Sequence, residues 1–158
     1  MNLNDTQGFE KLIDPTKYQV FLFSCPAYIP FSFAIHPWFV VNKKGIISRW
    51  EVYSKKNLNK TSWGHLHLNG FITSPFQGIH MFPFLKKYFW NPTLMATIEG
   101  NAAQKIIESI ETSPQKYPFC NTYSLLGPNS NTYIQWILNQ SPECNITLPW
   151  NAIGKNYV

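Results

Sequence analysis

The chain has 158 residues, 44% of them apolar and only 13% charged, which is enough apolar material for one buried core and excludes an intrinsically disordered protein. Its net charge of +5 comes from lysines in scattered pairs rather than from a basic stripe, which argues against nucleic acid as a partner. Three cysteines without a paired spacing argue against a disulfide framework and a zinc ribbon, and no cofactor is expected. We predict a single domain over residues 1–158, in which residues 1–17 form an N-terminal extension or a short helix.

The long apolar run at residues 18–41 is interrupted by Pro26, Pro30, His36 and Pro37. It therefore predicts two strands rather than a membrane helix, and no transmembrane segment is expected. The polar N-terminus shows no signal peptide. This pattern leaves the compartment open, with a soluble protein of the cytoplasm favoured.

Taken in chain order, the hydrophobic periodicity predicts more strands than helices. We predict strands at 18–24, 31–41, 46–54, 62–71, 93–100 and 121–126, and helices at 6–14, 101–112 and about 130–140. Prolines and glycines among the aromatic residues of 72–93 predict a long irregular connection. This order of elements indicates an α+β fold with a mostly antiparallel sheet packed against a few helices.

Two boundaries and the tail carry more specific predictions. Asn101 is the expected N-cap of the second helix, and Pro114 is expected to end it. The C-terminal tail is expected to be extended and held against the core by Leu148, Trp150 and Ile153.

The strands at 31–41 and 46–54 predict a hairpin with its turn at residues 42–45. If Val41 lies opposite Ile46, then His36 directly faces Glu51. A shift by one residue would send the two side chains to opposite faces of the sheet.

A His36–Glu51 pair has a chemical meaning. A carboxylate that accepts from one ring nitrogen orients the imidazole and leaves the other nitrogen free to take a proton. The same register places Trp38 across from Arg49, where a cation–π contact would form beside the pair. The alternative is an ordinary surface pair of little energetic weight.

The segment "GPNSNT", residues 127–132, combines a turn with the start of a helix. If Asn129 is the N-cap, Ser130 is the first helical residue, and the N–H groups of Ser130 and Asn131 form an arrangement typical of an oxyanion hole. Ser130 would then be a nucleophile, with His36 as its base and Glu51 orienting the base. The alternative is that Ser130 itself caps the helix.

The segments "FAIHPWFVV", "RWEVY", "YPFCNTYSLLGPNSNTYIQWIL" and "LPWNAIGKNYV" resemble domain-of-unknown-function family 3750, a bacterial family, over most of residues 30–158. "GPNSNT" and "AIGK" are its hallmarks. The family carries no activity that the resemblance could transfer.

A more distant resemblance is to circularly permuted papain-like domains of the PPPDE, NlpC and lecithin:retinol acyltransferase-like groups. "YSLLGPNSNTY" is similar to their helix start, with Ser130 where they have a nucleophilic cysteine, His36 matching their strand histidine, and Glu51 on the following strand. This resemblance implies a permuted papain-like fold and a hydrolase or acyltransferase that acts on an amide, ester or thioester. The serine is a departure, because a hydroxyl is a weaker acid than a thiol. A non-catalytic binding or structural domain on the same scaffold is the alternative.

The expected ligand is an unknown small molecule, lipid or peptide. Asn129, Asn131, Trp38 and Arg49 are candidate binding residues, because they flank the three candidate catalytic groups. The aromatic segment 76–90 is either core and lid packing or one wall of an apolar groove for an acyl or peptide substrate.

Two other kinds of site have less support in the sequence. His65 and His67 share one strand face, but no third ligand has a recognisable spacing, so no metal site is predicted. A basic binding module would need Lys43, Lys55 and Lys86 on one face.

Overall fold

The computed structural model describes residues 6–71 and 73–157. Its elements are α1 (Thr6–Glu10), β1 (Tyr18–Pro26), β2 (Ile35–Lys43), β3 (Ile46–Val52), β4 (Ser62–Trp63), β5 (Leu66–Leu68), β6 (Thr93–Glu99), α2 (Gly100–Lys116), α3 (Ser130–Leu138) and the 3-10 helix η1 (Pro142–Cys144). The strands form one sheet in the order β4-β5-β3-β2-β1-β6, with every neighbouring pair antiparallel. The predicted α+β class with an antiparallel sheet is confirmed.

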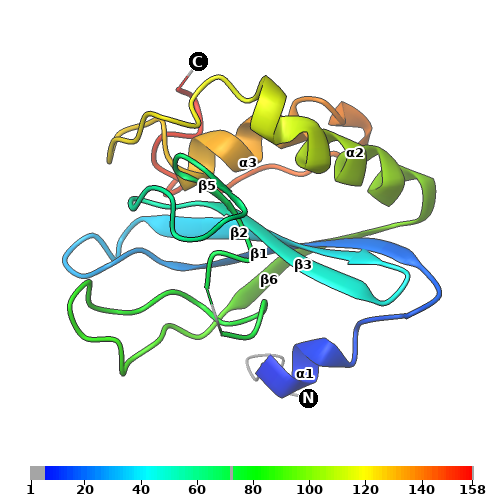
Figure 1. Cartoon of the computed structure of the whole chain (residues 1–158), viewed down its shortest axis with the longest axis horizontal. Coiled ribbons are helices and arrows are strands. Elements are labelled where there is room, and N and C mark those ends of the chain that lie inside the picture. The colour runs from blue at the N-terminus through cyan, green and yellow to red at the C-terminus, as the bar shows by residue number, and fades with distance from the viewer. Residues whose placement is uncertain (1–5, 72, 158) are drawn as a thin grey trace.

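The sheet separates two apolar layers. Helices α2 and α3 cover one face, while α1 and the irregular segment before β6 lie on the other (Figure 1). Alternate side chains of β2 enter the two layers: Phe39 and Val41 pack towards α2 and α3, whereas Trp38 and Val40 pack into the opposite cluster. The two central strands are therefore buried on both faces, which explains their nearly continuous apolar sequence.

The β2–β3 hairpin has a different register from the predicted one. Lys43 pairs with Ile46 and Val40 pairs with Arg49, a shift of two residues. The turn is formed by Lys44 and Gly45, whose φ angles of 52° and 92° are typical of the two-residue turn that matches strand twist. Because the shift is even, the side chains that were predicted to share a face still share it.

Helix α2 also differs at both ends. It begins at Gly100, and Glu99 occupies the N-cap position without a side-chain hydrogen bond, so Asn101 is not the cap. Pro114 lies inside the helix instead of ending it. A proline removes one backbone donor, and here the Ser113 hydroxyl donates to the Ile110 carbonyl that this donor would have served, at 2.6 Å.

Residues 121–126 do not form the predicted strand. Their backbone groups bond within a local turn instead, with Ser124 N–H donating to the Pro128 carbonyl at 2.8 Å and Gly127 N–H donating to the Ser124 carbonyl at 3.1 Å. Trp150 is 81% exposed and does not hold the tail, whereas Leu148 and Ala152 are buried. In the part of the chain that the structure describes, we find no helix with the length and apolarity to cross a membrane.

Candidate functional site

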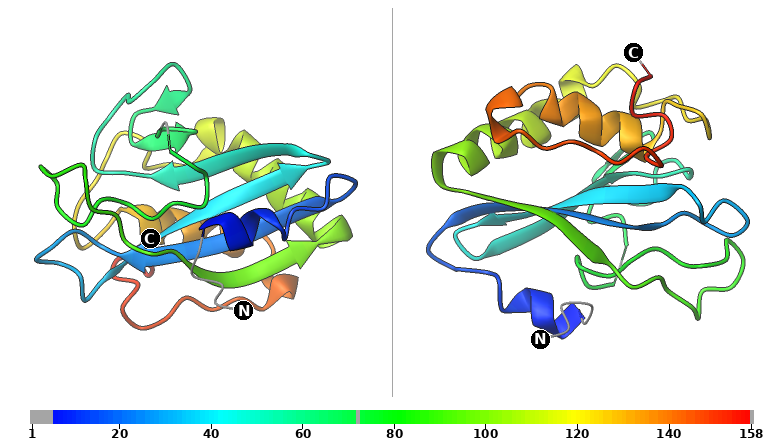
Figure 2. Two further views of the ribbon diagram at one scale, coloured as in Figure 1. Left: turned by 90° about the horizontal axis from the view of Figure 1, so that it is seen from below. Right: turned by 180° about the vertical axis from the view of Figure 1, so that it is seen from behind.

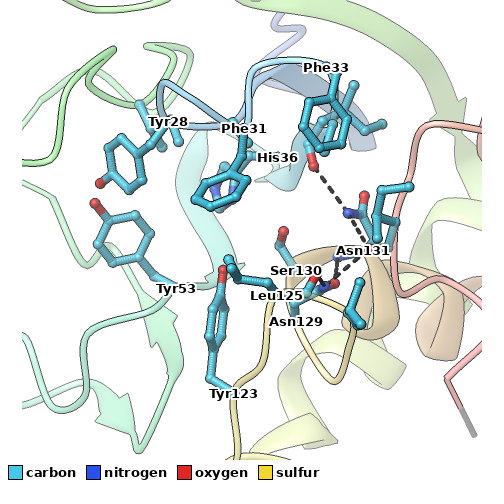
Figure 3. A pocket seen from close by; sticks show the side chains of 16 residues that line it. Tyr28, Phe31, Phe33, His36, Tyr53, Tyr123, Leu125, Asn129, Ser130 and Asn131 are labelled. Carbon is cyan, nitrogen blue, oxygen red and sulfur yellow. Dashed lines mark hydrogen bonds between the residues drawn. The ribbon is translucent and has the colours of Figure 1, made fainter.

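A cavity of about 340 Å³ lies where the ends of β2 and β3 meet the start of α3 (Figure 3). Most of its wall is aromatic or aliphatic. It is lined by Ala27, Tyr28, Phe31, Phe33, Ala34, Ile35, His36, Tyr53, Ile79, Tyr123, Leu125, Leu126, Asn129, Ser130, Asn131 and Ile153. Two of the three candidate catalytic residues, His36 and Ser130, therefore line one cavity, although His36 lies on the sheet face opposite α3.

Helix α3 begins in the first of the two predicted ways, with Asn129 rather than Ser130 as its cap. Asn129 is the N-cap, and its side chain accepts from the N–H groups of Asn131 and Thr132. The Thr132 hydroxyl in turn accepts from the Asn129 N–H at 3.0 Å, which completes a capping box. Ser130 is the first helical residue, so the alternative in which Ser130 caps the helix is wrong.

The cap leaves the Ser130 hydroxyl unused. Ser130 is buried, and none of the hydrogen bonds among the described residues involves its Oγ. In Figure 3 this hydroxyl points into the cavity. The N–H of Asn131, by contrast, is committed to Asn129 Oδ1 at 3.0 Å, so the expected oxyanion hole loses its second donor and retains only the Ser130 N–H.

His36 is held by the predicted carboxylate. Its Nε2 lies 2.9 Å from Glu51 Oε2, and both side chains are buried. The register places the two residues diagonally rather than directly opposite, and the imidazole spans that offset. Since the carboxylate can only accept, Nε2 carries a proton, and the lone pair of the neutral ring is on Nδ1.

Arg49 fixes Glu51 from the other side. Arg49 Nε donates to Glu51 Oε1 at 2.7 Å and Nη2 donates to Oε2 at 2.8 Å, a two-pronged ion pair. Burial acts to raise the pKa of Glu51, but the Arg49 charge and the hydrogen bond from His36 outweigh it and lower this pKa to about 2. Glu51 is therefore an anion at any physiological pH.

Trp38 and Arg49 support the site from behind and do not line the cavity. The Arg49 guanidinium lies 4.3 Å from the Trp38 ring centroid, which is the cation–π contact that the sequence predicted. Trp38 Nε1 donates to the Pro75 carbonyl at 3.0 Å, and Arg49 Nη1 donates to the Gln77 carbonyl. Arg49 therefore holds Glu51, and Trp38 packs against Arg49, while neither side chain lines the cavity.

Ser130 and His36 are not in direct contact. The hydrogen-bond network of residues 6–71 and 73–157 contains no bond between the Ser130 hydroxyl and the imidazole. Hydrogen bonds of this kind are often long or absent before a substrate binds. The structure thus brings the two groups to one cavity without joining them.

The two family hallmarks interlock beside Ser130. Asn129 Nδ2 and Asn131 Nδ2 both donate to the Ile153 carbonyl, at 3.0 and 2.9 Å, and the Thr132 hydroxyl donates to the Gly154 carbonyl at 2.7 Å. Asn131 also donates to the Ile35 carbonyl at 3.0 Å, next to His36. The amides of the two asparagines predicted to bind a ligand thus connect α3, the tail and the start of β2.

Tyr53 is the most informative residue that sequence reasoning missed. It follows Glu51 by two positions, so strand alternation places it on the same face, and its ring lies 6.0 Å from that of His36. Its hydroxyl has no hydrogen-bond partner in the described part of the chain. Burial raises the pKa of Tyr53, so the hydroxyl stays protonated and can donate to a ligand.

The aromatic segment 76–90 contributes only Ile79 to the cavity. Phe76 is buried in the cluster on the opposite face of the sheet from α2 and α3, as packing alone would require. His65 and His67 bond to the carbonyls of Tyr53 and Lys55. Within the described ranges, no group of three or more histidine, cysteine or acidic side chains could hold a metal ion.

The comparisons with known proteins give one match. A family model described as "Protein of unknown function (DUF3750)" matches residues 17–157. No curated protein and no solved structure shows a significant match to the chain. Because the family model spans nearly the whole chain, including both hallmark segments, the chain belongs to the DUF3750 family.

Proposed function

We propose that the cavity is an acyl-transfer site of a hydrolase or acyltransferase that acts on an amide, ester or thioester. Ser130 is the nucleophile, His36 is the general base, and Glu51 orients the imidazole. The observation that supports this proposal is that Asn129, and not Ser130, caps helix α3. Asn129 provides the cap, which leaves the Ser130 hydroxyl unbonded in the cavity that His36 also lines.

The tautomer of His36 suits this role. Glu51 occupies Nε2, so Nδ1 takes the proton from Ser130 as Oγ forms a bond to the substrate carbonyl carbon. The carbonyl oxygen becomes an oxyanion, for which the Ser130 N–H is the available donor. Collapse of this intermediate expels the leaving group, which takes the proton back from Nδ1. Water or an acceptor then removes the acyl group by the same steps.

The chain order of the three groups supports a permuted papain-like arrangement. The histidine is on β2, the polar partner is on β3, and the nucleophile starts the later helix α3. A serine in place of a cysteine needs a stronger base, because the hydroxyl is the weaker acid. The ionised Glu51 supplies this by stabilising the imidazolium that forms.

The cavity wall indicates the kind of substrate. Phe31, Phe33, Leu125 and Leu126 form an apolar approach to Ser130. Burial of an apolar group there is favourable by about 25 cal/mol per Å² of apolar surface removed from water. The substrate therefore carries an apolar acyl or aromatic portion, from a lipid, a peptide or another small molecule.

A serine-reactive fluorophosphonate tests the proposal. We expect an adduct on Ser130, located by peptide mass spectrometry, that is absent in Ser130→Ala. In His36→Asn the labelling rate should fall by about 100-fold or more, because the base is lost. His80→Asn is the matched control, since His80 lies outside the cavity, and it should label at the wild-type rate. An adduct on another residue, or the same labelling rate in wild type and His36→Asn, would overturn the catalytic assignment.

A second candidate is a binding domain on the same scaffold. The missing Ser130–His36 bond favours it, as does Arg49, which already neutralises the Glu51 charge. In that case the probe gives no adduct, and an apolar fluorescent ligand binds wild type and Ser130→Ala with the same affinity.

A further inference from the structure

Bulky apolar side chains stand exposed on three loops at one end of the molecule. Their exposed fractions reach 93% at Phe84, 76% at Leu126 and 63% at Phe33. We name this set the apolar rim: Phe31, Phe33, Phe84, Leu85, Leu125 and Leu126. Exposed apolar residues that occur singly need no explanation, but a group on neighbouring loops marks an interaction site.

The three loops lie together. Segments 27–34, 81–90 and 121–128 gather at the same end of the fold in all three views (Figures 1 and 2). The first two are joined by hydrogen bonds, from the Ile29 N–H to the Met81 carbonyl at 3.0 Å and from Trp90 Nε1 to the Ala27 carbonyl at 3.1 Å. The first and third line the cavity from opposite sides, so their four rim residues flank the cavity, while Phe84 and Leu85 lie on the segment joined to the first.

The charges at this end are all positive. Lys86 and Lys87 directly follow the tip at Phe84 and Leu85, and the sequence has no acidic residue between Glu51 and Glu99. Lys55 lies two residues beyond Tyr53, which lines the cavity, so Lys55, like Lys86, lies at the cavity end of the fold. Both lysines are exposed.

Lys43, the third lysine of the basic module considered from the sequence, does not lie at the cavity end. Lys43 lies at the opposite end of β2, where its Nζ binds Glu111 Oε1 at 2.8 Å. The acidic residues Glu99, Glu108 and Glu111 are on β6 and α2 rather than on the rim loops. At the cavity end, exposed apolar side chains and lysines therefore occur together, and the three rim loops contain no acidic residue.

We propose that this end of the protein docks on the surface of an anionic lipid bilayer, with the apolar rim entering the interface and the cavity mouth facing the lipid. Lys55, Lys86 and Lys87 would contact the headgroups. The apolar side chains are on separate loop tips instead of one packed face. A bilayer accommodates such tips singly, whereas a protein partner would need a complementary pocket for each. The inference does not depend on a reaction at Ser130.

Co-sedimentation with vesicles tests the docking. Wild-type protein should bind phosphatidylcholine vesicles that contain 30% phosphatidylglycerol about tenfold or more tightly than pure phosphatidylcholine vesicles, and high salt should weaken this binding. Phe84→Ser/Leu85→Ser should lower the partition coefficient by at least about tenfold, and Lys86→Ala/Lys87→Ala by about tenfold on anionic vesicles alone.

Ile46→Ser is the matched control, because Ile46 is 72% exposed and is the first residue of β3, next to the hairpin turn and far from the rim. It should bind as wild type does, and so should Ser130→Ala, which separates docking from catalysis. The proposal is wrong if the wild-type protein does not bind anionic vesicles, or if Ile46→Ser loses as much binding as Phe84→Ser/Leu85→Ser. Self-association through the rim without vesicle binding, measured by light scattering, would assign this end to a protein interface instead.

Discussion

At the scale of single residues, the central feature is a carboxylate buried between a guanidinium and an imidazole. Glu51 has no exposed surface, and it bonds to Arg49 through both oxygens and to His36 through one. A buried charge without partners would cost several kcal/mol, so each member of this trio depends on the others. The same trio that would tune the base also stabilises the fold.

This dependence gives a pH signature. The pKa of Glu51 in the folded state is about 2, below its ordinary value of 4.5. The unfolded chain therefore takes up the proton first as the pH falls. The stabilisation is complete above pH 4.5 and is lost between about pH 4.5 and pH 2, and it amounts to on the order of 3 kcal/mol.

We expect Glu51→Gln to lower the free energy of unfolding by about 3 kcal/mol at pH 7, and to differ less from wild type as the pH approaches 3. Urea unfolding at several pH values measures both quantities. Glu111→Gln is the control, because Glu111 is an exposed carboxylate paired with Lys43, and it should cost less than about 1 kcal/mol. A Glu51→Gln difference that stays constant from pH 7 to pH 3 would contradict the pKa assignment.

At the scale of elements, the hallmark segments at 127–132 and 152–155 stabilise each other. Gly154 has a φ of 91°, and a Cβ at this position would lie 2.5 Å from Asn129 Nδ2. A side chain there would be strained and would also displace the N-cap of α3. The glycine of "AIGK" is therefore required by the asparagine of "GPNSNT".

Two glycine substitutions distinguish the steric clash of a Cβ with Asn129 from the backbone strain of a positive φ angle. Gly100 also has a positive φ, of 66°, but a Cβ there would meet nothing within 4 Å. We expect Gly100→Ala to cost about 1 kcal/mol from backbone strain alone, and Gly154→Ala to cost about 2 kcal/mol more. Thermal and urea unfolding give the comparison. Equal losses would show that Gly154 does not support the cap.

The predictions from sequence succeeded where the pattern is local. The period of two in 31–41 and 46–54 placed His36 and Glu51 on one face, and Asn129 followed by Ser130 marked the start of α3. The predicted pairing of β2 with β3 was wrong by two residues. A shift of two leaves the same side chains on each face, so the pattern of apolar residues cannot detect it, and only the position of the turn at Gly45 fixes the pairing. Residues 121–126 have strand-like composition, but they lie in a turn outside the sheet, which composition does not reveal.

At the scale of the whole molecule, the candidate site joins three distant parts of the chain. His36 comes from the first third, Ser130 from the last, and the tail at Ile153 closes the cavity beside them. Sequence spacing gave the identity of the polar groups. It could not give the cavity wall, which comes from the irregular loops at 27–34 and 121–128, whose path depends on long-range packing.

Replacement of the nucleophile by a thiol tests most directly whether His36 acts on position 130. We would measure the alkylation rate of Ser130→Cys by iodoacetamide against pH, in a Cys144→Ser background, because Cys144 is the half-exposed native thiol whereas Cys25 and Cys120 are buried. An imidazolium nearby lowers the pKa of a thiol, whereas an apolar cavity alone raises it above its ordinary value of about 8.5. The two cases therefore shift the profile in opposite directions.

We expect the introduced thiol to react with a pKa of about 7 or lower, and this pKa to rise above about 8.5 when His36→Asn is added. A pKa above about 8.5 that is the same with and without His36 would contradict the claim that Ser130 and His36 form one reactive site.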